Sequence, residues 1–236
     1  MARVDDVGAL LARLGFPRDV AGVALQGFGG WRPRYDWDSQ LIEAGPELVA
    51  GIHARALPSI MLCGANGLGK TLFSAMLVVE SVRAGAIEYP WEVQRIYDKT
   101  TRDRVLNEAR AHGFSKTEQE LRGQVQVVMT EIPTSESAVP SMEYREAPYP
   151  RLLLVEEFGR SPSEWGFDWW LRTYEALQVF GGCLVFLSNL APDQLRQVEE
   201  RLTGSAALRD RLNDGRIFLF TGQSFREWRK SQRGKS

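Results

Sequence analysis

The residues with the clearest capacity for chemistry lie between Gly64 and Thr71, where the sequence reads GANGLGKT. This segment, here called the phosphate loop, matches the pattern G-x-x-x-x-G-K-[ST] in full. Its glycines let backbone N–H groups turn inward toward phosphate oxygens, and a helix that follows adds the positive end of its dipole. Lys70 would reach the β- and γ-phosphates, and Thr71 would bind Mg²⁺. The expected nucleotide-binding residues are Gly64, Ala65, Asn66, Gly67, Leu68, Gly69, Lys70, Thr71 and Leu72.

Two carboxylates follow the apolar run LLLV, at Glu156 and Glu157. Successive residues of a strand point to opposite sides, so one carboxylate can face the metal while the other faces an attacking water. We assign Glu156, together with Thr71, to Mg²⁺, and Glu157 to polarising the water. Glutamates solvated in a loop are the simpler interpretation of such a pair, and the phosphate loop upstream favours the functional one.

Four further polar residues could complete a reaction at a γ-phosphate. Asn189 ends the apolar run CLVFLS, where it can bind the attacking water and the phosphate, although Asn is also a common turn former. A guanidinium supplied by a neighbouring subunit can accelerate phosphoryl transfer strongly. In a chain so rich in arginine, any single one is more often a surface charge. The candidates are Arg209, Arg211 and Arg226.

The elements that must position these residues form an α/β pattern. Short apolar runs alternate with segments of helical periodicity, which predicts a parallel sheet covered on both faces. Ligands of such sheets bind beyond the carboxyl ends of the strands, where every motif above falls. Strands are expected at 59–63, 93–97, 151–155, 183–188 and 216–220, with a further candidate at 125–130. Helices are expected at 4–15, 17–25, 46–56 (opened by Pro46), 72–84, from strand 93–97 to about 111, 164–179 and, as two pieces, 192–212; 27–38 is expected to be irregular.

Composition excludes several classes of protein. The 236 residues are 44% hydrophobic and 25% charged with a net charge of −1, which indicates a globular chain without a global basic field for nucleic acid. Cys63 and Cys183 lie in apolar runs, as buried free thiols of a reducing compartment do. No Cys/His zinc pattern and no apolar run of about 18 residues or more is present. We therefore expect a cytoplasmic protein without a membrane partner.

Aromatic residues in two segments raise a choice between packing and partner contact. The segment from Trp31 to Trp37 interleaves aromatic and basic side chains, as single-strand binders do, but packing of an N-terminal arm onto the core is the favoured interpretation. In the helix 164–179, Trp170 falls on the expected buried face. Trp165 and Trp169 fall elsewhere and are candidates for a subunit contact.

The motifs GANGLGKT, LLLVEEFG, FLSNL, LRDRL and GQSFR occur in an order that resembles AAA+ ATPases of the DnaC/IstB-like group, over residues 46–228. This resemblance implies a P-loop NTPase sheet ordered 5-1-4-3-2 with a minimal C-terminal lid. It implies ATP and Mg²⁺ as ligands, Glu157 as the catalytic glutamate, Asn189 as first sensor and Arg226 as second sensor. Arg211 belongs to the D-R-L segment. The resemblance also implies assembly of copies on ATP or DNA, single-stranded or duplex, with a helicase or a transposase as partner.

The sequence departs from the group in several places. Glu156 stands where Asp is usual, which changes the reach toward magnesium, and Ala207 stands where helicase loaders tend to have arginine, a role that Arg209 could take. Residues 112–150 form a longer insertion or loop than expected. We divide the chain into an N-terminal helical arm (1–45) for partner docking, an ATPase domain (46–228) and a basic tail (229–236).

Four functions compete on this reading. A helicase loader of DnaC type is favoured, and an IstB-like transposition helper is the alternative within the same fold. A small-molecule P-loop kinase and a nucleotide-binding scaffold with weak hydrolysis belong to other classes. The strand-end carboxylates and Asn189 favour the ATPase over the kinase, which needs a lid and substrate-binding arginines instead.

Overall fold

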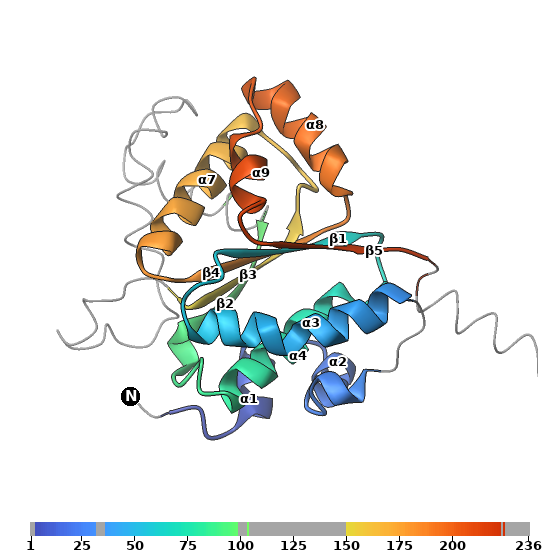
Figure 1. Ribbon diagram of the computed structural model, residues 1–236, viewed down its shortest axis with the longest axis vertical. Helices are drawn as coiled ribbons and strands as arrows, with labels where there is room; N and C mark the ends of the chain where they lie inside the picture. Colours follow the sequence, from blue (N-terminus) through green and yellow to red (C-terminus); the bar gives the residue numbers. More distant parts are fainter. Residues whose placement is uncertain (1–2, 32–35, 99–102, 104–149, 223, 225–236) are drawn as a thin grey trace, which may run out of the picture.

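A computed structural model describes residues 3–31, 36–98, 103, 150–222 and 224, and shows a five-stranded sheet between two layers of helices (Figure 1). All strand pairs are parallel, and their order is β2-β3-β4-β1-β5. Read from the other edge, this is the order 5-1-4-3-2, so the predicted sheet is confirmed. The strands are β1 (Ser59–Gly64), β2 (Val93–Tyr97), β3 (Leu152–Phe158), β4 (Cys183–Ser188) and β5 (Arg216–Phe220).

Each central strand is buried on both faces because alternate side chains enter different hydrophobic clusters. Ile60 and Leu62 of β1 pack with helix α4 (Lys70–Arg83), whereas Met61 and Cys63 pack with helix α7 (Glu164–Val179). This two-sided burial explains the continuous apolar runs in the sequence. Cys63 and Cys183 are buried free thiols, as expected.

The helices on the α7 side have nearly the predicted bounds. The two pieces expected over 192–212 are α8 (Pro192–Thr203) and α9 (Ala207–Leu212). Glu199 of α8 is buried, and its carboxylate accepts hydrogen bonds from the backbone N–H groups of Leu208 (2.7 Å) and Arg209 (3.0 Å). This side chain satisfies donors at the start of α9 and so fixes α9 against α8.

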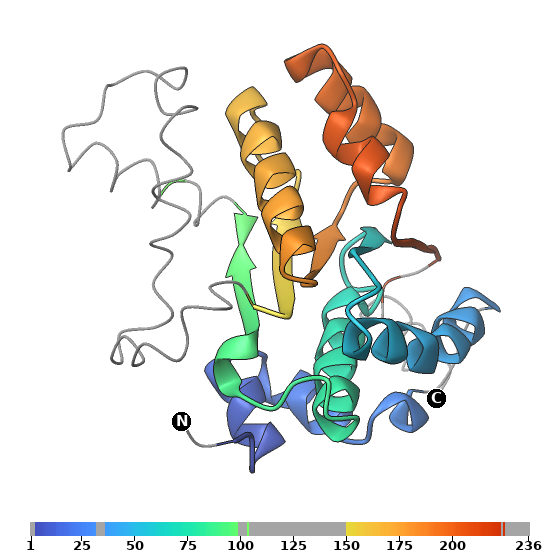
Figure 2. The same ribbon diagram turned by 60° about the vertical axis from the view of Figure 1, so that its left-hand side comes forward.

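The N-terminal helices lie on the opposite face, beneath α4 (Figures 1 and 2). Helices α1 (Val7–Arg13) and α2 (Arg18–Ala24) and the 3₁₀ turn η1 (Phe28–Gly30) contribute buried side chains to the same cluster as α4 and the sheet. Trp31 is buried edge-on to Phe73 of α4, with ring centroids 6.4 Å apart. The preference for packing over DNA contact is therefore confirmed for Trp31. The arm shares one core with the sheet.

The predicted start of the third helix at Pro46 is wrong. Helix α3 runs from Asp36 to His53, with Pro46 inside it, so the irregular segment expected to end at residue 38 stops earlier. An interior proline costs a helix about 3 kcal/mol because it lacks an N–H and crowds the preceding turn. Leu41, Leu48 and Ile52 are fully buried, and burying each contributes about 1.5–3 kcal/mol. Burial of this face outweighs the proline.

Trp169 also corrects an expectation. Its side chain is 1% exposed and lies 4.4 Å from Trp170, centroid to centroid, so it offers no subunit contact. Helix α7 contacts α8 and α9 as well as β4, so it is covered on more than one side. Of the helix expected after β2, only Asp98 and Asp103 are described, and both are helical. The candidate strand 125–130 lies outside the described residues, as does nearly all of the segment 112–150. Among the described helices, none is long and apolar enough to cross a membrane.

Candidate nucleotide site

The phosphate loop leaves β1 and enters α4 with the backbone that its glycines allow. Gly64, Gly67 and Gly69 have φ angles of +135°, +80° and +105°, a region that other residues rarely adopt. A Cβ atom on Gly64 would stand 2.2 Å from the carbonyl oxygen of Phe220, so only glycine fits there. Residues 65–67 are exposed at the tip, while Leu68 is buried and anchors the loop.

Lys70 lies beneath the loop and joins it to the end of β4. Its ammonium donates to the carbonyl oxygens of Gly64 (2.5 Å) and Ala65 (2.9 Å) and to Oδ1 of Asn189 (3.1 Å). Burial lowers the pKa of Lys70 to about 8, an effect that Cys63 and Glu156 partly oppose. The structure thus brings the side chain of Asn189 to that of Lys70, at the edge of the sheet beside the phosphate loop.

Glu156 points to the α4 side of the sheet, toward the first turn of that helix. Its Oε2 lies 3.5 Å from the hydroxyl oxygen of Thr71, and its Oε1 accepts bonds from Arg95. A hydroxyl and a carboxylate that face each other beside a phosphate loop are the oxygen donors that Mg²⁺ uses with nucleotides. The donor set therefore fits a magnesium ion. No group of three or more His, Cys, Asp or Glu side chains suited to a metal occurs in the described part of the chain, so phosphates and waters would have to complete its coordination.

Glu157 adopts a different backbone from its neighbour. It has φ +58°, and the pairing of β3 with β4 shifts register between Val155 and Phe158. A left-handed, non-glycine residue at an irregularity of this kind is uncommon, and such residues concentrate at functional sites. The Glu157 carboxylate is partly exposed and pairs with Arg160 at 2.6 Å. It lies beside the site but turns toward the surface.

The ends of β3 and β4 are tied together by Ser188, which sequence analysis missed. Its hydroxyl donates to the carbonyl of Phe158 (2.8 Å) and accepts from the N–H of Leu190 (3.1 Å). Asn189 lies between Ser188 and Leu190 in the sequence, so the bond from Leu190 to Ser188 fixes the turn that places Asn189 near Lys70. No local pattern distinguishes this serine from any other at a strand end.

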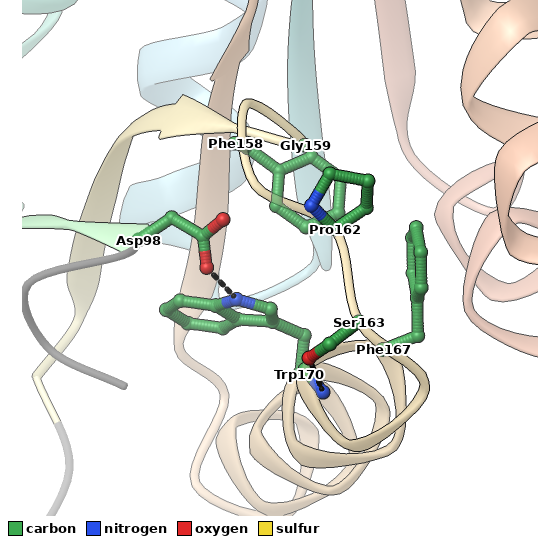
Figure 3. A pocket seen from close by; sticks show the side chains of 8 residues that line it. Asp98, Phe158, Gly159, Pro162, Ser163, Phe167 and Trp170 are labelled. Carbon is green, nitrogen blue, oxygen red and sulfur yellow. Dashed lines mark hydrogen bonds between the residues drawn. The ribbon is translucent and has the colours of Figure 1, made fainter. Parts of the chain in front are cut away.

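A small hollow lies on the α7 side of the sheet, beside the turn that follows Glu157 (Figure 3). Asp98, at the end of β2, is buried and accepts a 2.8 Å hydrogen bond from the indole N–H of Trp170. This bond connects β2 to α7 across the hollow. The lining residues are Asp98, Phe158, Gly159, Pro162, Ser163, Gly166, Phe167 and Trp170.

The structure separates the candidate arginines. Arg209 is partly buried, its charge acts on the Cys63 thiol at the end of β1, and it donates to Asn213. Arg211 is exposed and its charge acts on Tyr174. Arg226 lies outside the described residues. Ser224, two positions before Arg226, lies close to the loop: a Cβ atom added to Gly67 would be 3.0 Å from the Cβ of Ser224. The chain after β5 therefore passes the phosphate loop.

No protein-family model matches the sequence, and no curated protein matches it. Solved structures do match in fold. The crystal structure of DnaI superposes with a TM-score of 0.53 at 17% identity, covering 87% of this chain and 95% of DnaI. Domain III of the Thermotoga maritima replication initiation protein DnaA gives a TM-score of 0.53 at 18% identity, covering 87% of this chain and 70% of that one. The chain has the AAA+ P-loop NTPase fold.

A third match is the replication initiator DnaA bound to AMPPCP and single-stranded DNA, with a TM-score of 0.53 at 13% identity. The match covers 89% of this chain but only 54% of that DnaA chain, so this chain spans about half of its length. These neighbours are consistent with the resemblance to the DnaC/IstB-like group, and at such identities the likeness is one of fold.

Proposed function

We propose that this AAA+ chain binds and hydrolyses ATP with Mg²⁺ and serves as a DNA-associated helicase loader of DnaC type. One observation carries the proposal: the side chains of Lys70 and Thr71 at the start of α4, Glu156 of β3 and Asn189 directly after β4 meet beside the phosphate loop. A kinase does not need this pairing of a strand-end carboxylate with an asparagine at the lysine.

Each side chain has a distinct task in this proposal. Lys70 would exchange its loop carbonyls for phosphate oxygens and neutralise their charge. Thr71 and Glu156 would hold Mg²⁺, which supplies charge stabilisation at the phosphates when bound. Asn189 would orient the γ-phosphate and the attacking water. Glu157 would polarise that water, and to do so its carboxylate must leave Arg160, which makes hydrolysis conditional on a local rearrangement.

The three candidate arginines have different tasks in this proposal, and one of them would act between copies assembled on ATP or DNA. Arg211 is exposed on α9, where a neighbouring copy could use it in trans at the γ-phosphate. Arg209 is partly buried and its charge acts on Cys63 of its own β1, so it would act within the same copy. Arg226 remains the proposed second sensor because the chain passes the loop tip at Ser224.

The partner is tested by capture from cells with the full chain, since Leu10, Leu11 and Phe16 of the proposed docking arm belong to the core and truncation would remove them. Recovery of a hexameric helicase in the presence of ATP would support loading. Recovery of a transposase would replace the loader with the IstB-like alternative. DNA binding should require ATP and weaken steeply with salt, because each neutralised phosphate releases counterions. DNA binding that ignores ATP would contradict both.

ATP affinity should fall as the pH rises through the pKa of Lys70, which burial lowers to about 8. Phosphates favour the charged lysine, so the free protein must take up a proton on binding once the pH exceeds about 8, and the affinity loss approaches about tenfold per pH unit. Below that range this group contributes no pH dependence.

Titration calorimetry from pH 7 to 9.5, in buffers of different ionisation heat, measures both the affinity and the proton uptake. Lys70→Arg is the matched control, because a guanidinium stays charged throughout. An equal pH dependence in both proteins would show that Lys70 is not the titrating group.

A further inference from the structure

Arg95 of β2 forms a buried ion pair with Glu156. Its Nε and Nη2 donate to Oε1 of Glu156 at 3.0 Å and 2.9 Å, and the two side chains are 4% and 9% exposed. In the parallel pairing of β2 with β3, Arg95 lies opposite Leu154, and Tyr97 opposite Glu156. Arg95 and Glu156 therefore project from the same face of the sheet, the face that α4 and the N-terminal helices cover.

The same guanidinium binds the N-terminal arm. Its Nη1 donates to the carbonyl oxygens of Leu14 (3.2 Å) and Gly15 (2.8 Å), and its central carbon lies 4.4 Å from the centre of the Phe16 ring. Leu14 is the C-cap of α1, where backbone carbonyls lack partners within the helix and favour a positive charge. One side chain thus joins the end of α1 to the carboxylate at the end of β3.

This arrangement leaves the two oxygens of Glu156 with different surroundings. Oε1 receives both guanidinium bonds, while Oε2 faces the Thr71 hydroxyl at 3.5 Å. A planar guanidinium restricts the rotation of a carboxylate more than a single contact does. Glu156 has one more rotatable bond than aspartate, so its reach toward the metal depends on such a restraint.

We infer that Arg95 is a positioning residue: it fixes the orientation of Glu156 for Mg²⁺ and makes that orientation depend on the Leu14–Gly15 turn of the N-terminal arm. Only the part of the inference that concerns Mg²⁺ rests on the proposed function; the coupling of Glu156 to the arm does not. Because coupling between two places is reciprocal, the arm must also sense Glu156, whether or not a nucleotide is present. A partner that docks on the arm would then alter the magnesium carboxylate through Arg95.

The first test is the Mg²⁺ dependence of ATP binding in Arg95→Met and Arg95→Lys. Loss of an outer partner of a metal ligand typically weakens metal binding by about 10- to 100-fold. Arg95→Met should therefore need at least about tenfold more Mg²⁺ for its half-maximal effect, with ATP affinity in EDTA unchanged. Arg95→Lys, which keeps the charge but not the fork, should recover part of the loss. An unchanged or lower Mg²⁺ requirement in Arg95→Met would overturn the inference.

The second test needs no nucleotide. The N–H groups of Gly15 and Phe16 bond to the carbonyls of Ala12 (2.9 Å) and Leu11 (3.1 Å), so their hydrogen exchange reports on the end of α1. Arg95→Met should accelerate this exchange, and so should Glu156→Gln, which touches neither amide, each by about tenfold. Unchanged exchange in Glu156→Gln would disprove the coupling.

Arg151→Met is the matched control for both tests. Arg151 also pairs with a buried glutamate, Glu92 (3.0 Å), and also donates to a backbone carbonyl, that of Ala86 (3.0 Å), but it lies at the opposite end of β3. It should change neither the Mg²⁺ requirement nor the exchange at Gly15 and Phe16. If the wild-type protein binds no ATP at all, the proposed function fails, while the exchange measurements still decide whether Arg95 couples Glu156 to the arm.

Discussion

Lys70→Ala is expected to weaken ATP binding by about 100-fold or more and to abolish measurable turnover. The variant removes a charge whose present partners are the loop carbonyls of Gly64 and Ala65 and the amide oxygen of Asn189. A hydrogen bond to a charged group contributes about 1.5–3 kcal/mol, and Lys70 would offer several to a triphosphate. Loss of one positioned donor to a developing charge costs a further factor of about 10²–10³ in rate. Calorimetric ATP titration with an assay of released phosphate measures both effects.

Arg196→Ala is the control for the change in net charge. Arg196 is an exposed residue of α8 whose ion pairs are with Glu200 and Asp210, away from the loop. It should bind and turn over ATP as the wild type does. If Lys70→Ala retained wild-type affinity, the phosphate loop would not be the nucleotide site, and every role assigned around it would fall together.

Glu157→Gln is expected to lower turnover by about 10²–10⁴-fold while ATP affinity changes little. The amide keeps the size of the side chain but cannot accept a proton, so binding through Lys70 and Thr71 survives and the polarised water is lost. Since glutamate and glutamine share the same backbone cost at φ +58°, the variant should fold as the wild type does. Single-turnover hydrolysis measures the expected loss of rate, and parallel binding measurements check that ATP affinity is kept.

Glu200→Gln removes an exposed carboxylate of α8 and provides the control. Equal turnover in Glu157→Gln and wild type would leave Glu157 without a hydrolytic role. The weak-hydrolysis scaffold would then be the better description of this protein.

The parts of the fold that the sequence predicts well are those encoded locally. Strands buried on both faces appear as unbroken apolar runs, and the glycines of the phosphate loop appear at fixed spacing, so neither depends on distant residues. The start of α3 could not be predicted in this way. Pro46 gives a strong local signal, and it is overridden by burial of Leu41, Leu48 and Ile52, which depends on the completed core.

Side-chain pairing across the fold was the other source of error. Arg95 stands in the expected strand VQRIY, where a charged residue can indicate a buried ion pair. Its partners Leu14, Gly15 and Glu156 come from segments far apart in the sequence, so no local pattern identifies them. Trp169 was misplaced because helical periodicity assumes one covered face, whereas α8 and α9 also contact α7. Such contacts depend on the tertiary arrangement and produce no periodic pattern in the sequence.

The sheet order has a consequence for how the chain matures during synthesis. Strand β1 is flanked by β4 and β5, so its hydrogen-bonding edges stay unpaired until more than half of the chain has followed it. At a ribosomal pace of about 5–20 residues per second, that interval lasts roughly ten seconds. Leu10, Leu11 and Phe16 belong to the same hydrophobic cluster as Phe220. The apolar faces of the N-terminal helices therefore remain exposed on the nascent chain until β5 is made. Productive folding is therefore a late event, and the nascent chain is a natural client for chaperones.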